Sequence, residues 1–348
     1  MKNLLTAFLL LCLTLSGCKQ DFDITADYKE ITVVYGLLNS NESTHYLRIQ
    51  KGYLIDGDAF QAGGVADSIY YNDSLLVQIK ALPNGATYTL TKVDGNLIGL
   101  PKDTGTFANQ PNWLYRFSAA LNTTATYQLT IKNTSNGNVI TAKTKLVTPF
   151  TLSVPSPDPG NKGQKFKFST TSPGKAVFYT IENAGLYDLK IRFPYKEYNA
   201  SDNSFIKDDY IETYIFKSKF IPHITGGLQV IEDVNAGIII NALKNTLVQS
   251  PSVYRVFDVS KGMTFTFAAG GTELANYINS TTAQSGSIGA NEALPPYTNL
   301  SNGYGIFSSR IYQSVDSVLL TNEGLDELAC NPLAAGLRFK SSSGQICE

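Results

Sequence analysis

Alternation of apolar and polar residues at period two dominates the first half of this 348-residue chain. Such alternation places successive side chains on opposite faces of a β-strand. Asn-Gly pairs at 84–85 and 136–137 separate neighbouring runs and favour hairpin turns, because both residue types tolerate positive φ. The pattern therefore predicts an immunoglobulin-like antiparallel β-sandwich over residues 29–148. The alternating runs are 31–35, 45–49, 75–82, 87–93, 112–121, 126–133 and 139–147.

Two aromatic residues have expected places in such a sandwich. Tyr127 lies two residues before Leu129 on a predicted strand, the position of a tyrosine corner, with an ordinary strand aromatic as the alternative. Trp113 is the one tryptophan of the chain and is expected to anchor the sandwich core.

Four prolines in residues 149–163 divide the chain. Proline removes backbone donors and favours extended structure, so this stretch is predicted to be a linker. Strand-like alternation then returns, and residues 164–348 are predicted to form a β-rich α+β domain with few short helices. The expected strands are 165–170, 176–182, 186–193, 209–220, 264–269 and 304–315, and the expected helices are 239–249 and 271–284.

Two local signals refine this second half. Thr272 stands at the start of the second expected helix and is the predicted N-cap. Asn302, Gly303 and Gly305 are expected to supply positive-φ positions for a tight turn that delivers a buried strand.

The chain opens with a different pattern. Lys2 is followed by an almost wholly apolar run over residues 4–15, then by Ser16, Gly17 and Cys18. A charged start, an apolar middle and a small-residue cleavage site are the layout of a secretory signal. A membrane-spanning helix needs about 20 apolar residues, so this run is too short to be one. Residues 1–17 are predicted to be a signal peptide and residues 18–28 a tether.

The four residues 15–18, Leu-Ser-Gly-Cys, resemble the bacterial lipobox. In that motif the cysteine thiol takes a diacylglyceryl group, and cleavage then leaves the cysteine first in the mature protein. Cys18 is the predicted lipidation site. Lys19 directly after it resembles lipoproteins sorted to the outer membrane, and Asp21 and Asp23 resemble the surface-export signal of Bacteroidota-type lipoproteins. We therefore expect a lipid-anchored outer-membrane protein exposed at the cell surface.

Charge and cysteine usage agree with export. The formal net charge is −1 and no basic block is present, so nucleic acid is not an expected partner. Cys12 leaves with the signal and Cys18 is taken by lipid, so Cys330 and Cys347 remain. In an oxidising compartment two remaining cysteines most simply pair, with two free thiols as the alternative.

No residue pattern indicates catalysis, a cofactor or a metal. The two histidines, His45 and His223, have neither a second histidine nor an acidic residue at metal-ligand spacing. Nucleophile-elbow, phosphate-loop and zinc-protease motifs are absent from the sequence. Acidic clusters at 56–58 and 202–209 do not have the spacing of a calcium loop. For glycan binding, the tyrosine pairs at 70–71 and 195/198 are the candidates to line a groove.

Three segments, taken in order behind a lipobox, resemble one family. They are ITVVYGLLN (31–39), ATYQLTIKNTSNGNVITAKTKL (125–146) and PPYTNLSNGYGIFSSR (295–310), the last preceded by ELANYI (273–278). The chain is similar to the Bacteroidota outer-membrane lipoproteins grouped as domain-of-unknown-function family 4249. The resemblance implies a surface or periplasm-facing lipoprotein, a β-sandwich followed by a β-rich domain, and linkage to large outer-membrane receptors. It brings no catalytic or ligand-binding residues.

The leading functional hypothesis is a non-enzymatic binding or accessory lipoprotein that partners a TonB-dependent outer-membrane receptor. One alternative is an adhesin or pilus-like structural subunit, which would assemble by strand addition. The other is a glycan-binding or carbohydrate-active surface protein. The sequence does not identify the ligand.

Overall fold

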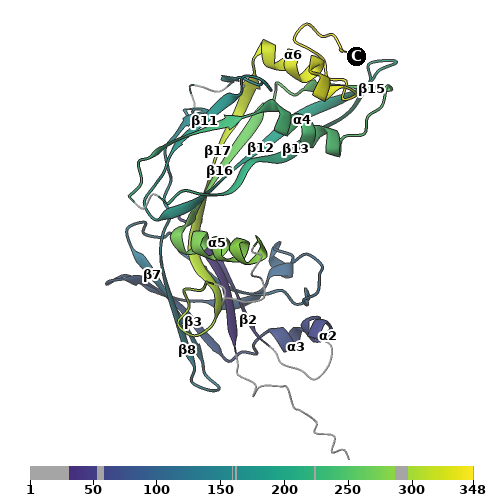
Figure 1. Ribbon diagram of the computed structural model, residues 1–348. Coiled ribbons are helices and arrows are strands. Elements are labelled where there is room, and N and C mark those ends of the chain that lie inside the picture. Colours follow the sequence, from purple (N-terminus) through teal and green to yellow (C-terminus); the bar gives the residue numbers. More distant parts are fainter. Residues whose placement is uncertain are drawn as a thin grey trace, which may run out of the picture.

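The computed structural model describes residues 31–52, 59–158, 160, 163–222, 225–286 and 297–347. Strands account for 47% and helices for 16% of the residues, so the expected mainly β fold with few short helices is confirmed. The described strands form three sheets. Figure 1 shows two lobes, one above the other, connected by long strands. The predicted signal peptide and tether, with Cys18, lie outside the described residues.

Two sheets pack face to face in the lower lobe. One is the four-stranded sheet β4-β3-β7-β8, and the other consists of β1, β2, β6 and β5 at one end of a ten-stranded sheet. Leu47 and Ile49 from one sheet, and Ile79 and Leu129 from the other, belong to one cluster and are at most 1% exposed. Burial of each such side chain contributes about 1.5–3 kcal/mol. The bounds are β1 (Thr32–Leu38), β2 (Thr44–Lys51), β3 (Leu75–Leu82), β4 (Thr87–Thr89), β5 (Thr91–Asp94), β6 (Trp113–Ser118), β7 (Thr126–Asn133) and β8 (Val139–Lys145), with short helices α2 (Ala59–Gly63), α3 (Ala66–Ile69) and η1 (Gly95–Ile98).

One strand, β17 (Tyr304–Leu320), belongs to both lobes. Its residues 304–309 pair in parallel with β1. Its residues 310–318 pair in antiparallel fashion with β16 (Met263–Gly271) of the upper lobe. The sheet order β13-β12-β16-β17-β1-β2-β6-β5 therefore runs through the whole molecule (Figure 1).

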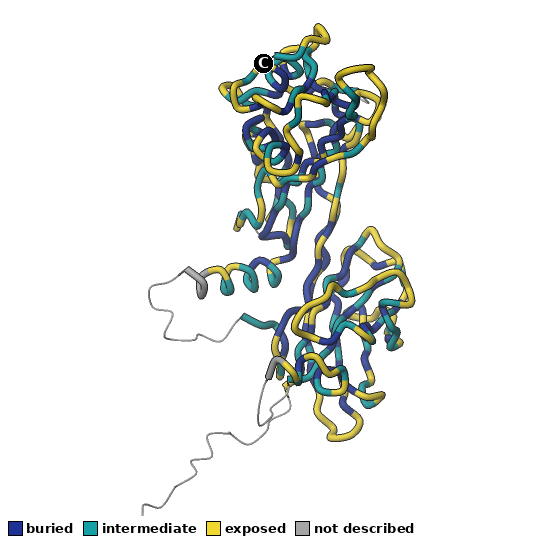
Figure 2. Tube along the Cα trace, turned by 90° about the vertical axis from the view of Figure 1, so that its right-hand side faces the viewer, coloured by how far each residue is buried: buried dark blue, intermediate teal, exposed yellow. Residues whose placement is uncertain are grey.

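Both hydrophobic cores lie on the same face of β17. Phe307 belongs to the lower core, whereas Ile311 and Val315 belong to the upper core. These residues are spaced by four, so their side chains point to one face of the strand. Arg310 and Tyr312 point to the opposite face, which is exposed there. The tube in Figure 2 shows the buried path that runs from one lobe into the other.

The upper lobe packs a second, aromatic-rich core between the large sheet and a three-stranded sheet of order β14-β11-β9. Helices α4 and α6 lie in this lobe, and α5 lies at the waist between the lobes (Figure 1). The bounds are β9 (Leu152–Val154), β10 (Lys165–Phe166), β11 (Gly174–Tyr179), β12 (Ala184–Asn199), β13 (Phe205–Phe220), β14 (Gln229–Val234), α4 (Ala236–Thr246), β15 (Val253–Phe257), α5 (Thr272–Gly286), α6 (Asn322–Cys330) and η3 (Pro332–Ala334).

The predicted hairpins form. After Asn84-Gly85, residues 87–89 of the predicted run pair with β3 as β4, whereas residues 91–94 form β5 and pair with β6 in the other sheet. The runs on either side of Asn136-Gly137 pair as β7 and β8. Gly137 has the positive φ expected of it, at 78°. Part of the segment predicted to be a linker, residues 152–154, forms β9 and pairs with β11. Phe150 next to it is 4% exposed in the upper core.

Both predicted helices exist, with shifted bounds. Residues 239–249 correspond to α4, whose first turn is capped by the Asn235 side chain accepting from the Gly237 amide. Residues 271–284 correspond to α5. The N-cap prediction for Thr272 is wrong, because Thr272 is the first helical residue and its hydroxyl donates to the Asn183 carbonyl. The sequence pattern missed α6.

Three residues with predicted roles show how the lower lobe is built. The Tyr127 hydroxyl accepts from the Asn122 amide at 2.7 Å, the backbone contact of a tyrosine corner. Gly305 has φ +96°, and a side chain there would collide with the Val34 carbonyl of β1. The same prediction is wrong for Asn302 and Gly303, which do not have positive φ. Trp113 corrects an expectation, because it packs on a small satellite cluster around Ile69 and Tyr70 instead of the main core.

Candidate functional site

A hollow of about 260 Å³ lies at the waist, between α5 and the outer face of the ten-stranded sheet. Leu274 and Ile278 line it from α5, and Leu186 lines it from β12. The sheet residues beneath the helix are small: Ala268 and Gly270 of β16. A β-carbon at Gly270 would lie 2.9 Å from a Leu274 methyl carbon, so the glycine lets the helix approach the sheet.

Side-chain hydrogen bonds fix helix α5 to the lower lobe. The Glu273 carboxylate accepts from the Thr144 hydroxyl of β8 at 3.1 Å and from the Ser308 hydroxyl of β17 at 3.2 Å. The Tyr277 hydroxyl lies 3.3 Å from the Tyr35 hydroxyl of β1. Burial, together with this Tyr277 contact, raises the pKa of Tyr35 to about 12. The roof of the hollow is therefore held by hydrogen bonds as well as by packing.

A β-bulge shapes one wall of the hollow. The register of β12 and β13 places two residues, Lys217 and Ser218, opposite the single residue Asp188. Ser218 has φ 54°, and its amide donates to the Asp188 carboxylate at 2.6 Å. The bulge thereby occupies one carboxylate oxygen of Asp188 and places Lys217 at the hollow.

Two cations border the hollow, Lys217 from β13 and Arg310 from β17. Neither has an ion-pair partner among the residues that the structure describes, since every ion pair found there joins other side chains. Each cation lies over a tyrosine ring of its own strand. The distances to the ring centroids are 5.3 Å for Lys217 over Tyr214 and 5.2 Å for Arg310 over Tyr312. Such cation–π contacts restrict where the charged groups lie.

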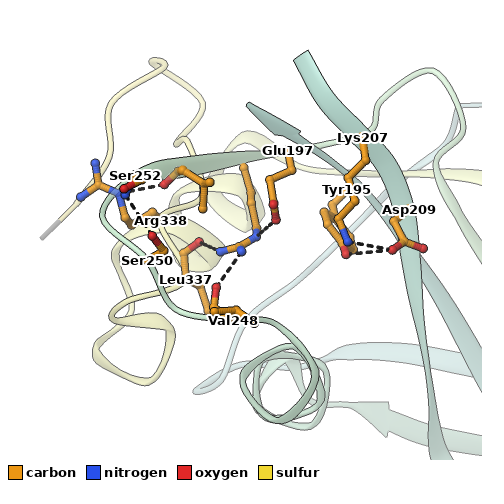
Figure 3. A network of polar contacts seen from close by, with 11 residues as sticks. Tyr195, Glu197, Lys207, Asp209, Val248, Ser250, Ser252, Leu337 and Arg338 are labelled. Carbon is orange, nitrogen blue, oxygen red and sulfur yellow. Dashed lines mark hydrogen bonds and ion pairs between the residues drawn. The ribbon is translucent and has the colours of Figure 1, made fainter. Parts of the chain in front are cut away.

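A second polar cluster, in the upper lobe, is structural. Arg255 of β15 is 2% exposed, and its guanidinium donates to Glu197, to the Leu337 carbonyl and to the Val248 carbonyl, each at 2.8 Å. Figure 3 shows these acceptors converging from a strand, the C-terminal segment and the end of α4. Each of the three guanidinium nitrogens donates one hydrogen bond to the protein, so the cluster holds the fold together.

His45 is a core residue. It is 2% exposed, its Nε2 lies 3.1 Å from the Ala119 carbonyl, and its ring packs on Phe117 at 4.8 Å between centroids. Burial lowers its pKa. His223 lies outside the described residues. Across the described ranges, no group of three or more His, Cys, Asp or Glu side chains is placed to hold a metal ion.

The predicted tyrosine groove is not formed. Tyr70, Tyr71 and Tyr195 are 3%, 5% and 1% exposed, and Tyr198 stacks on Tyr254. These side chains are committed to packing and are not available to stack on a sugar. The glycan-binding alternative therefore loses the residues on which it was based.

The acidic clusters are likewise occupied locally. Asp208 pairs with Lys261, and Asp209 pairs with Lys207. Asp202 accepts from the amide and hydroxyl of Ser204 in a turn. The cluster at residues 56–58 lies outside the described residues.

The predicted cysteine pairing is confirmed. Cys330 at the end of α6 is bonded to Cys347 in the C-terminal segment. The bond holds the segment that supplies the Leu337 carbonyl to Arg255.

No pattern in the sequence indicates the hollow. Its residues come from five strands and one helix, and only strand pairing brings them together. The strongest local signal is that Lys217 and Arg310 each lie within three residues of a tyrosine on an alternating strand. This pattern is common on exposed sheet faces and does not by itself identify a site.

No protein-family model matches this chain, and no curated protein matches it. Among solved structures, the C-terminal globular domain of an oligosaccharyltransferase from Pyrococcus abyssi is 11% identical, with a TM-score of 0.24. That match covers 65% of this chain and 45% of the other. A similarity this weak supports no inference about fold or function. No helix in the described ranges is long and apolar enough to cross a membrane.

Proposed function

We propose that this protein is a lipid-anchored outer-membrane lipoprotein, exposed at the cell surface, that acts as a non-enzymatic binding or accessory protein. The anchor is the predicted lipid on Cys18. The hollow at the waist carries the binding part of the proposal, because it combines apolar walls with two cations that have no ion-pair partner among the described residues. Its partner is a TonB-dependent receptor of the outer membrane, as the resemblance to the lipoprotein family implies.

The proposal also covers the fold class of each lobe. We assign the lower lobe to the immunoglobulin-like class and the upper lobe to a β-rich α+β domain. Two face-to-face sheets and the Tyr127 backbone contact support the first assignment. Helices α4 and α6 beside the upper sheets support the second.

Acyl chains on one residue suffice for such an anchor. Each buried methylene contributes about 0.8 kcal/mol, and one chain alone binds only marginally and reversibly. Two or three chains on Cys18 give a stable attachment and leave the folded lobes in water.

The test is metabolic labelling with palmitate, followed by membrane fractionation. Wild type is expected to incorporate label, and Cys18→Ala is expected to lose it and leave the membrane fraction. Cys12→Ala is the matched control, since it removes a thiol six residues earlier, within the apolar run, and should keep both label and location. Unchanged labelling or fractionation of the Cys18 variant would contradict the proposal.

One observation favours the structural-subunit alternative. Strand β13 is 16 residues long and ends the ten-stranded sheet, with β12 as its one neighbour among the described strands. Edge strands are templates for strand addition, and Tyr210 and Tyr214 are exposed on one face of this one. Lysines at 207, 217 and 219 oppose such pairing by charge.

Sedimentation of the acyl-free protein separates the two functions. Strand addition predicts oligomers that grow with concentration and are lost in Thr213→Pro, because proline removes an amide donor from β13. The accessory function predicts a monomer in both proteins. Concentration-dependent oligomers that the proline variant abolishes would favour the structural subunit.

A further inference from the structure

We propose that the hollow at the waist binds a carboxylate that carries an apolar group about the size of one amino-acid side chain. The inference rests on the proposed binding function and names the ligand class of that site. The lining residues that would contact this ligand are Leu186, Asp188, Lys217, Ala268, Leu274 and Arg310.

The volume sets the size of the ligand. Sites for drug-sized molecules occupy about 300–1,000 Å³ and enclose most of the ligand. The hollow, at about 260 Å³, lies below this range. It therefore accommodates one compact group and is too small for an extended oligosaccharide or a folded domain.

The apolar lining residues determine which group fits inside the hollow. Leu186 on the sheet and Leu274 on α5 face it from opposite sides, and Ala268 leaves room between them. An apolar group placed here leaves water and gains contacts on both sides. Phenyl and branched aliphatic groups fit this environment.

The charged lining residues determine which polar group of a ligand is favoured. Lys217 and Arg310 stand on strands separated by β12 and β16, so these strands lie about 14 Å apart at roughly 4.8 Å per strand, and the register offsets the two residues by two positions along the strands. A carboxylate in the hollow lies between these two cations. Asp188 offsets one of the two positive charges, and its Oδ1 is already bound to the Ser218 amide. The residues that line the hollow are left with one net positive charge, while the nearby Glu273 carboxylate is held by Thr144 and Ser308, so the lining favours a carboxylate over a neutral or cationic group.

This chemistry has two sources, a free small acid or the C-terminal carboxylate of a peptide with an apolar last residue. Two pairs of probes distinguish them. The first pair is 3-(4-fluorophenyl)propionate and its amide, followed by fluorine NMR. The second pair is acetyl-Gly-Gly-Phe with a free C-terminus and with a C-terminal amide, followed by calorimetry. The full chain is used, purified in detergent.

The proposal predicts that at least one acid binds and that its amide binds about tenfold more weakly or not at all. The tighter of the two acids identifies the source. The double variant Lys217→Glu/Arg310→Glu is expected to weaken the binding acid about tenfold or more. Lys132→Glu, at an exposed position on β7 away from the hollow, makes the same kind of charge change and should leave binding unchanged.

Ala268→Leu provides a second, uncharged variant. Its larger side chain fills the space between sheet and helix and should abolish binding of both acids. Equal binding of acid and amide, binding that none of these variants alters, or no binding of either acid would overturn the proposal. The probe titrations do not depend on acylation, so their failure and a failure of palmitate labelling are separate results.

Discussion

Arg255 shows how a single residue departs from what its type predicts. Arginine is usually exposed, but this one is 2% exposed in the upper lobe. Burying a guanidinium costs several kcal/mol unless hydrogen bonds and an opposite charge replace its water. Glu197, Val248 and Leu337 supply these, so the side chain joins β12, the end of α4 and the C-terminal segment.

Replacing this arginine should destabilise the fold strongly. Arg255→Met leaves Glu197 and two backbone carbonyls without their donor, and removing one partner of a buried pair costs about 3–5 kcal/mol. Urea unfolding of the purified chain measures the loss. Arg192→Met is the matched control, because Arg192 and its partner Glu212 are 49% and 31% exposed and such a pair is worth under about 1 kcal/mol. Equal losses in the two variants would contradict this account of Arg255.

Residues whose role depends on local spacing were predictable. Tyr127 makes the backbone contact that its position on the strand suggests, and Gly305 has the expected positive φ. Trp113 and the tyrosines at 70 and 71 were not predictable in detail, since their burial depends on which distant elements pack on them. Strand β15 is absent from the predicted strands for the same reason, because buried Arg255 interrupts its apolar pattern.

At the scale of elements, helix α5 was predicted but its place was not. Its periodic apolar residues identify a helix near residues 271–284. That it crosses the outer face of the sheet follows from Glu273, which bonds to Thr144 and Ser308. These partners lie 129 and 35 residues away in the chain, and no local pattern records such contacts. For this reason the sequence does not predict that the residues lining the hollow lie together.

The disulfide joins the last helix to the C-terminal segment and has a predictable energetic effect. The bond joins Cys330 and Cys347, which are 17 positions apart. In the chain-entropy model it lowers the entropy of the unfolded chain and so raises the free energy of unfolding by about 3 kcal/mol. The variant Cys330→Ser/Cys347→Ser should lose about this much in urea unfolding. A reducing agent should destabilise wild type equally and leave the variant unchanged. Two alkylatable thiols in the unreduced wild-type protein would contradict the bond.

At the scale of the whole molecule, strand order and chain order differ. The other strands of the lower lobe come from residues 32–145, but residues 304–309, late in the chain, pair with β1 there. Two hydrophobic cores are built on one face of a shared sheet, which leaves the other face free to carry α5 and the hollow. Alternation predicts strands, but it does not predict that one strand serves two lobes.

The proposed location depends on one atom, the Cys18 sulfur. Lipid there would hold the protein at the membrane surface and leave both lobes free to meet a receptor. The ligand proposed for the hollow and the partner proposed for the protein would then be encountered at the same surface.

The mass of the intact protein extracted from membranes tests the lipid anchor. A lipid on Cys18 predicts a mature polypeptide that begins at Cys18 and carries the added mass of a diacylglyceryl group. A mature chain that begins at another residue, with the Cys18 sulfur unmodified, would contradict the anchor and the function proposed from it.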